Sequence, residues 1–461
     1  LSRIFSGCSS LTSLDLSSWN VSRVTDLSYA FSGCTSLRTL SLSGWDTSHV
    51  TSVAGMFSEC KALSDLNLSA CKASTARQLL RALSAPAKLT SLHLEGVNAA
   101  GATDLSGMFQ NLSSLTMLDL SGWDVSSVTD FSSMFAGCSS LESLSLGEWN
   151  ASNGRNMSRM FYGCSSLSNL DLSSLSVGAA SNLSSMFSGC KQLAVLDLSN
   201  WSVSGDLSYM FDGCTSLHAV SLSSVSAQSI TSLAYAFQGC SSLESLDLST
   251  WNVAGSTDLT SMLSGCSGLR SANLAGWGVT DKTRCSNLLL GCSSLESLDL
   301  SGWNLTVARS ALDSLEAPAR LMNLRLSEMN VTNATPSSMF AKLSNLQSLD
   351  ISNWTVSGSS DLSNLLKGCR YPISLNLAGW TIIGSPTMSG IFAPISSTAS
   401  LSLPHWDVTQ AKSLTGLLGG FTSLSSLDLS GWRASSSTPL TDMFKGPRVS
   451  SLDLSGCTAA D

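Results

Sequence analysis

Hydrophobic and polar residues follow one pattern that recurs about every 26 residues along the whole chain. In residues 11–17, Leu14 and Leu16 alternate with serine and aspartate, which predicts a short strand with its leucines on the inner face. In residues 24–34, apolar residues recur at spacings of mostly three to four, which is typical of a one-sided helix or a short 3₁₀ segment. Each repeat is therefore expected to form a strand, a turn, a short helix or 3₁₀ segment, and a return.

Single residue types are confined to single positions of the repeat. When the units are aligned on the cysteine of Phe-Ser-Gly-Cys, all 12 tryptophans lie eleven positions after it and 12 of the 14 phenylalanines lie three before it. The step is 26 residues, except 24 between Cys190 and Cys214 and 25 between Pro318 and Leu343. Such columns are typical of stacked, translationally repeating structures. With the LxxLxL strand pattern, they predict an α/β fold: a right-handed leucine-rich-repeat solenoid of about 18 units of 26 residues. We expect a parallel sheet on one face, short helices or 3₁₀ turns on the other, and one solenoid over residues 1–461.

A second, longer period is also visible. The stretch from Ala76-Arg77 to Leu89 resembles the stretch from Ala308-Arg309 to Leu321 at an offset of 232 residues, nine units less two residues. This similarity predicts that a nine-unit block was duplicated. Neither end shows an atypical polar capping unit, so we expect the chain to be a segment of a longer array.

Composition excludes several classes of protein. Only 12% of the residues are charged, the formal net charge is −8, and no cluster of lysine and arginine occurs, which argues against nucleic acid as a partner. Hydrophobic residues make up 43% of the chain, but no apolar run is long enough to predict a membrane span in this segment.

The repeat resembles that of BspA-like bacterial surface proteins. Residues 115–140 show the shared features in order: the leucine strand, Trp123-Asp124-Val125, Val128-Thr129-Asp130 and Met134-Phe-Ala-Gly-Cys138. The Val-Thr-Asp element departs from this pattern in many units, as at residues 180–182 and 385–387. The resemblance implies a leucine-rich-repeat solenoid in a secreted or surface-attached protein that is used for adhesion and binding.

Catalysis is not expected from this sequence. The four histidines are scattered over different units, and no metalloprotease, phosphate-binding or nucleophile-elbow motif occurs. No catalytic, cofactor-binding or metal-binding residue is therefore predicted.

The cysteine and tryptophan columns are interpreted as core. Cysteines in phase point the same way and lack CxxC spacing, so a buried, reduced stack is favoured over disulfides or zinc. Cys285 and Cys292 are a close pair that is expected to face each other. The tryptophans are favoured as core, with a glycan-stacking platform as the alternative.

The outward strand column is the best candidate for binding. Nine of 18 units hold aspartate there, and a ladder of carboxylates about 5 Å apart would gain from a cation or from a basic or polyhydroxyl ligand. The alternative is a solvated face. The predicted ligand face comprises Asp119, Asp171, Asp197, Asp247, Asp299 and Asp350. His93, Met117, Val195 and Arg325 interrupt the regular outward positions and also favour a ligand site.

Sequons for N-glycosylation are frequent, although many would arise by chance in so serine-rich a chain. The candidate acceptors are Asn20, Asn67, Asn111, Asn150, Asn156, Asn182, Asn200, Asn304, Asn330, Asn333 and Asn353.

The sequence thus favours a non-enzymatic, secreted or cell-surface solenoid that binds a protein or glycan, or copies of itself. The alternative is a structural filament or coat component in which the solenoid is a rigid spacer. A solenoid that binds a crystalline surface is less favoured, because the outward columns are Ser and Asp and not Thr.

Overall fold

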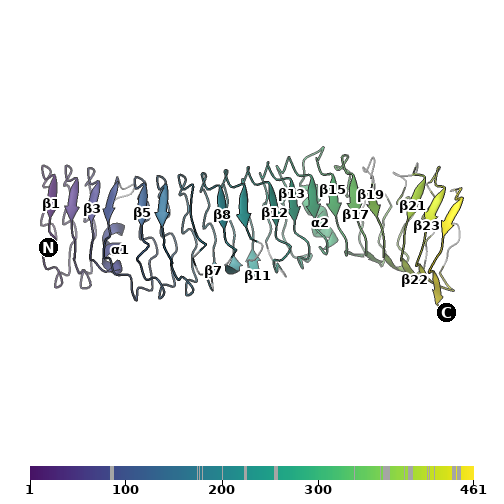
Figure 1. The fold of residues 1–461 in the computed structure, drawn as a ribbon, viewed down its shortest axis with the longest axis horizontal. Helices are drawn as coiled ribbons and strands as arrows, with labels where there is room; N and C mark the ends of the chain where they lie inside the picture. The colour runs from purple at the N-terminus through teal and green to yellow at the C-terminus, as the bar shows by residue number, and fades with distance from the viewer. Residues whose placement is uncertain are drawn as a thin grey trace. The chain divides into compact units, whose positions relative to one another are not determined.

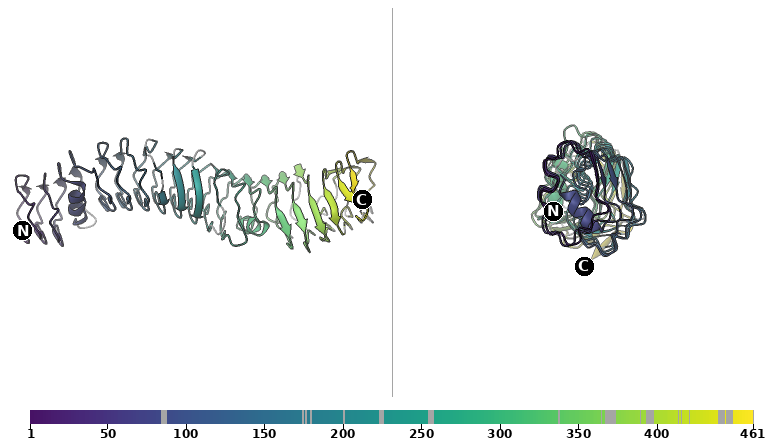
Figure 2. Two further views of the ribbon diagram at one scale, coloured as in Figure 1. Left: turned by 90° about the horizontal axis from the view of Figure 1, so that it is seen from below. Right: turned by 90° about the vertical axis from the view of Figure 1, so that its left-hand side faces the viewer.

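The structure is a computed structural model of the 461-residue chain, shown in Figures 1 and 2. It describes residues 1–83, 88–173, 175, 177–178, 180–199, 201–222, 226–253, 258–336, 338–363, 365–366, 374–388, 390–392, 398–412, 414, 416–419, 421–438, 443 and 448–460. Two compact units can be distinguished, Leu1–Ser242 and Leu243–Asp461. In each unit the chain winds in successive turns that lie side by side, with parallel strands on one face (Figures 1 and 2). The predicted parallel-sheet solenoid is confirmed.

In the first unit, the strand face consists of three-residue strands at the predicted position of each repeat except that at residues 169–171. These are β1 (Ser13–Asp15), β2 (Thr39–Ser41), β3 (Asp65–Asn67), β4 (Ser91–His93), β5 (Met117–Asp119), β6 (Ser143–Ser145), β8 (Val195–Asp197) and β10 (Ala219–Ser221). A second sheet comprises β7 (Ala180–Asn182), β9 (Ser202–Asp206) and β11 (Ser226–Ser232). Strands pair in phase with the repeat, as where Leu14 pairs with Leu40.

The second unit has two six-stranded sheets and one three-stranded sheet, all parallel. The strand face consists of β12 (Ser245–Asp247), β13 (Ser271–Asn273), β14 (Ser297–Asp299), β15 (Asn323–Arg325), β17 (Ser348–Asp350), β19 (Ser374–Asn376), β21 (Ser400–Ser402), β23 (Ser426–Asp428) and β25 (Ser451–Asp453). The other six-stranded sheet follows the turn after each strand and comprises β16 (Asn330–Thr332), β18 (Thr355–Ser357), β20 (Thr381–Gly384), β22 (Asp407–Ala411), β24 (Arg433–Ser435) and β26 (Thr458–Ala460).

The side opposite the strand face is built mostly of consecutive tight turns. The Ala30 amide donates to the Leu27 carbonyl, while the Leu27 amide donates to Ser52 of the next coil. Tyr29 (φ 56°) and Gly33 (φ 79°) occupy the third positions of successive turns, where a type II turn requires positive φ. Because alternate amides bond to the neighbouring coil, a continuous helix does not form. The expected one-sided helix or 3₁₀ segment is therefore replaced here by a series of turns.

Two α-helices interrupt this pattern at equivalent places of the repeated block, α1 (Ala73–Arg81) and α2 (Leu305–Asp313). Each is nine residues long and buries one apolar face, as the spacing of its small and aliphatic residues predicts. Asn304 caps α2 by accepting from the Thr306 and Val307 amides, whereas Lys72 gives α1 no side-chain cap. Within the described residues, none of the helices is long and apolar enough to cross a membrane.

Ladders of identical side chains fill the core between coils. Phe109, Phe135 and Phe161 stack with ring centroids 5.4 Å apart, and Trp380 and Trp406 stack at 5.0 Å. These rings are almost completely buried. The prediction that tryptophan belongs to the core is therefore confirmed, and the glycan-platform alternative is wrong for the buried tryptophans.

The tryptophan and cysteine columns also satisfy backbone carbonyls of the preceding coil. Trp303 Nε1 donates to the Leu274 carbonyl at 2.7 Å, and the Cys164 thiol donates to the Phe135 carbonyl at 3.2 Å. Cys71, which stands in the tryptophan column, bonds to Leu42 in the way that a tryptophan would. The two columns therefore join neighbouring coils by hydrogen bonds as well as by packing.

The expected facing of Cys285 and Cys292 is not found. The Cys285 thiol donates to Val307 at 3.4 Å, whereas the Cys292 thiol donates to Leu263 at 3.2 Å, so the two thiols bond to different coils. Both are free cysteines, and the same holds for the other cysteines in the part of the chain that the structure describes. Cys369 lies outside that part.

Candidate binding site on the strand face

The outward aspartates form the turn that ends each strand. Asp119 Oδ1 accepts from the Ser121 amide at 3.0 Å, and Asp171, Asp197 and Asp247 make the same contact with the serine two residues on. Such Asx turns need a short acceptor side chain at that position. One oxygen of each predicted ligand carboxylate therefore already accepts a hydrogen bond within the turn.

The same contact lowers the pKa of Asp119 and of Asp197. The hydrogen bond from the Ser121 amide lowers the pKa of Asp119 below its ordinary value. The Ser199 amide likewise lowers the pKa of Asp197, although the negative charge of Asp171 acts in the opposite direction. At Asp197, stabilisation of the carboxylate by the turn therefore outweighs repulsion from the neighbouring Asp171.

Asp299 and Asp350 lie on either side of a cation that the chain itself supplies. Arg325 Nε lies 3.5 Å from an Asp299 oxygen and 3.8 Å from an Asp350 oxygen. In the described residues, no group of three or more histidine, cysteine, aspartate or glutamate side chains is arranged to hold a metal ion. A ligand-binding role for the six predicted aspartates stays a prediction, and these two carboxylates are the least available for it.

The sequons also have a structural explanation. Asn67, Asn150, Asn156 and Asn182 occupy Asx-turn positions where other units have aspartate, and each accepts from the amide of its sequon serine. The same arrangement serves Asn20 and Asn304, while Thr332 donates its hydroxyl to Asn330. Asn111, Asn333 and Asn353 have positive φ, which asparagine tolerates better than most residues. Asn200 lies outside the described residues. Glycosylation stays a prediction, since the turns alone account for these asparagines.

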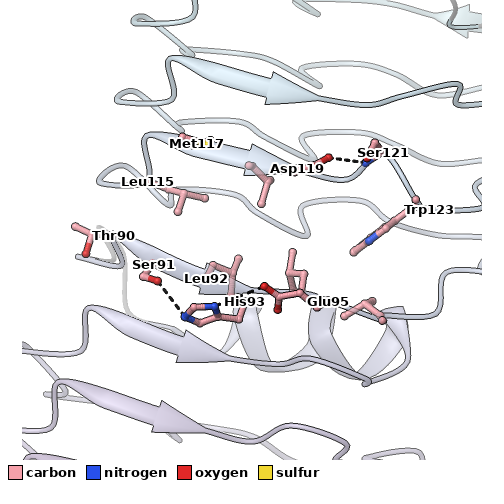
Figure 3. A pocket seen from close by; sticks show the side chains of 15 residues that line it. Thr90, Ser91, Leu92, His93, Glu95, Leu115, Met117, Asp119, Ser121 and Trp123 are labelled. Atoms are coloured by element: carbon pink, nitrogen blue, oxygen red, sulfur yellow. Dashed lines mark hydrogen bonds and ion pairs between the residues drawn. The ribbon is translucent and has the colours of Figure 1, made fainter.

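The strand ladder is interrupted between β4 and β5. β4 ends the sheet formed by β1 to β4, and β5 begins a separate two-stranded sheet with β6. On the opposite side the same two coils remain joined, because the amides of Leu105 and Phe109 donate to Asp130 and Met134. The two coils are therefore joined opposite the strand face but unpaired at β4 and β5, whose side chains Figure 3 shows on either side of the gap. The ladder also stops after β6, where residues 169–171 are not in a strand.

A groove of about 510 Å³ lies along this interruption. Its floor is apolar, with Leu94, Leu115 and Leu118 almost completely buried. Met117 lies on the β5 side with 67% of its surface exposed. Figure 3 shows it across the groove from His93 of β4.

The charged groups that line the groove are acidic apart from His93. His93 Nε2 lies 3.1 Å from the Ser91 hydroxyl and 3.3 Å from an Asp65 oxygen, and its Nδ1 lies 3.7 Å from Glu95. The Glu95 side chain is 74% exposed. A hydrogen bond from its own backbone amide, followed by one from the Ser69 hydroxyl, lowers the pKa of Glu95, so the carboxylate is ionised at neutral pH. With Asp119, the groove presents two carboxylates and no lysine or arginine among its lining residues.

The repeated block provides an internal comparison for this groove. At the offset of 232, β15 corresponds to β4, and β17 is the next strand, yet β15 and β17 pair in register. The Leu326 amide donates to Asp350 at 2.7 Å, and the Ser348 amide donates to Met322 at 2.9 Å. In the first block the corresponding bonds would join Leu94 to Asp119 and Met117 to Thr90, and neither forms.

The sequence predicted parts of this site but not the groove. His93 and Met117 were expected on the ligand face as irregular outward residues, and Asp119 as a member of the acidic column; the structure brings all three to one groove. Glu95 was missed because it lies just beyond the strand. The sequence does differ at this place: the step from Pro86 to Leu112 is 26 residues, whereas the equivalent step from Pro318 to Leu343 is 25. The two coils are therefore not equivalent.

These features define the class of protein. A 26-residue repeat with one leucine-rich strand in each coil, stacked into parallel sheets over an apolar core, is that of a leucine-rich-repeat protein. The chain belongs to the family described as "Mycoplasma protein of unknown function, DUF285", whose profile matches residues 1–95, 103–219, 205–323, 317–402 and 360–456. No curated protein matches the chain significantly in sequence.

Solved structures with a similar course of the chain include receptors and a bacterial protein. The chain is 20% identical to a chain of the complex of TLR13 with ssRNA13, with a TM-score of 0.37, covering all of this chain and 62% of that one. It is 17% identical to the plant peptide hormone receptor RGFR1 in complex with RGF2, with a TM-score of 0.34, covering 93% of this chain and 64% of that one. It is 16% identical to a leucine-rich-repeat protein of Leptospira interrogans, with a TM-score of 0.27, covering 86% of this chain and 90% of that one. The chain thus spans less than two thirds of the length of the two receptor chains.

Proposed function

We propose that this chain is a non-enzymatic binding scaffold at a cell surface, and that it binds a protein ligand on its strand face at the groove between β4 and β5. The observation that carries the proposal is the interruption of the sheet beside the exposed Met117. Elsewhere on the strand face, exposed positions are mainly serine and aspartate engaged in turns. An exposed apolar side chain beside unpaired strand edges favours contact with another protein.

The extracellular part of the proposal is supported by the resemblance of the 26-residue repeat to BspA-like surface proteins. The buried free thiols are compatible with that location. Burial raises the pKa of Cys138 and Cys214 to about 12, so these thiols hold almost no thiolate at neutral pH and resist oxidation without forming disulfides.

Site-specific photo-crosslinking on intact producing cells tests both parts. A benzoyl-phenylalanine replaces Met117 in one variant and Val195 in a matched control. Val195 is 52% exposed at the same strand position of β8, which also has one unpaired edge, toward residues 169–171, but it does not line the groove. We expect a membrane-impermeant biotin reagent to label both variants, and a discrete protein adduct to form from position 117 at several times the yield from position 195.

Three outcomes would contradict the proposal. Failure of the impermeant reagent to label the protein on intact cells would exclude the surface location. Equal adducts from both positions would exclude a site at the groove. Adducts that consist of two copies of this chain would favour the structural filament instead.

A further inference from the structure

We infer that the groove between β4 and β5 binds an extended peptide segment of a partner protein, which places its backbone along the two strand edges and a lysine or arginine side chain against Glu95 and Asp119. This inference rests on the proposed function and specifies its ligand. Its first basis is the set of backbone groups that the interruption leaves unpaired.

The unpaired groups follow from the pairing on either side. In a parallel ladder, successive residues bond alternately to the two neighbouring strands. On the β3 side, the Leu68 amide donates to the His93 carbonyl and the Ser91 amide to Ser64. On the β6 side, the Leu120 amide donates to Ser145. The groups left between these strands are therefore those of Thr90, Leu92 and Leu94 on one wall and of Met117 and Asp119 on the other.

The repeated block shows that these groups are able to pair. At the corresponding place the Leu326 amide bonds to Asp350, and the Ser348 amide bonds to Met322. In the groove, the same geometry offers the Leu94 and Met117 amides as donors and the Thr90 and Asp119 carbonyls as acceptors. One donor and one acceptor on each wall match the needs of an extended peptide, which adds to a strand edge through its main chain.

Charge complementarity specifies the side chains of the peptide. In the repeated block, Arg325 occupies the position of His93 and lies between Asp299 and Asp350. In the groove, His93 contacts Ser91 and Asp65 on its own side, so no cation of the chain bridges to Asp119 across the gap. A cationic side chain from the partner would occupy the place that Arg325 fills in the closed block. Met117 and the leucine floor favour apolar residues at the alternate positions, because an extended peptide points successive side chains to opposite sides.

The test is selection from a phage library of random linear dodecamer peptides against the full chain, followed by binding of the enriched synthetic peptides. Two variants probe the site. Glu95→Gln keeps the groove and the acceptor for Ser69 but removes one charge. The triple variant His93→Arg, Glu95→Ser, Met117→Ser introduces the residues of the closed block at the equivalent positions. Val195→Ser is the matched control, because it removes an exposed apolar side chain from the same face at a position outside the groove.

The expected result is enrichment of peptides that carry Lys or Arg among alternating apolar residues. Their affinity should fall about tenfold or more in Glu95→Gln and in the triple variant and stay unchanged in Val195→Ser. Bound peptide should also slow hydrogen exchange of the Leu94 and Met117 amides. Far-UV circular dichroism identifies any variant that fails to fold, and Glu95→Gln, a change on an exposed side chain, keeps the test decisive if the triple variant does not.

Several results would overturn the inference. Enrichment of neutral or acidic peptides would exclude the charge assignment. Tight binding without protection of the Leu94 and Met117 amides would exclude backbone pairing. No enrichment over the triple variant, together with a specific adduct from position 117 on cells, would exclude an extended peptide while leaving the proposed binding function intact. Loss of that adduct as well would exclude both the extended peptide and the proposed binding function.

Discussion

At the residue scale, the columns show which side-chain atoms the fold uses. Aspartate and asparagine exchange freely at the Asx-turn positions, because either side chain supplies the oxygen that accepts the amide two residues on. Cysteine recurs where a small, buried side chain can donate to the Phe-column carbonyl, as Cys138 does to Phe109 at 3.0 Å. The residue types that looked chemically active in the sequence are thus engaged in backbone contacts.

The thiols provide a prediction at this scale. Replacing the exposed Cys8 and Cys457, and Cys369 outside the described residues, by serine leaves eleven of the fourteen thiols. Burial raises the pKa of Cys60 to about 11 and of Cys292 to about 12, so few thiolates exist at pH 8. We expect less than about one equivalent of Ellman's reagent to react with the folded variant within minutes, and all eleven after denaturation. Rapid reaction of several thiols in the folded variant would show that the column is accessible.

At the element scale, the hydrogen bond from the tryptophan column to the preceding coil forms at some coils and not at others. Trp149 follows a coil with Trp123 in the same column, and its Nε1 donates to Leu120 at 3.0 Å. Trp201 and Trp251 follow coils whose column holds Leu175 and Val225, and their buried Nε1 atoms have no partner in the described structure. The bond is thus missing after these two breaks in the ladder, whereas Trp354, which follows Met329, keeps its bond to Leu326.

This difference predicts unequal costs for the same substitution. Trp149→Phe removes volume and a satisfied hydrogen bond, whereas Trp201→Phe removes the same volume together with an unpaired buried donor. We expect Trp149→Phe to lower the free energy of unfolding by about 1 kcal/mol more than Trp201→Phe, measured by urea titration. Both residues belong to the first unit, so each serves as the control for the other. An equal or greater cost at Trp201 would contradict the assignment of its Nε1 as unpaired.

At the scale of the whole molecule, the Asx turns together make the free energy of unfolding depend on pH. Hydrogen bonds from the following serine lower the pKa of Asp15, Asp119 and Asp171 in the folded chain. The unfolded chain therefore binds protons at a higher pH than the folded chain does, and acid favours unfolding. Asp212 is opposite: burial raises its pKa, although the Ser188 hydroxyl donates to it at 3.3 Å.

Two consequences can be measured by urea unfolding at pH 7, 5 and 3. The free energy of unfolding of the wild-type chain is expected to be highest above the ordinary aspartate pKa of about 4. It should fall as the pH drops through and below that value. Asp212→Asn keeps an acceptor for Ser188 and removes a charge that burial disfavours, so it should stabilise the chain at pH 7. That advantage should disappear once acid protonates Asp212 in the wild type. A less stable variant at pH 7, or a wild type that gains stability in acid, would contradict this account.

The sequence by itself determined the repeat, the strand positions and the buried columns, because each depends on local periodicity: Leu66 and Leu68 have to point inward once the strand forms. It did not determine whether neighbouring strands pair. β4 and β15 have almost the same local pattern, yet only β15 pairs with the next strand. That outcome depends on how coils of 26 or 25 residues stack, and on whether the outward residue is His93 or Arg325. The tertiary structure alone decided that one such place is closed and the other is a groove, since pairing joins groups from two coils whose separation the whole stack sets.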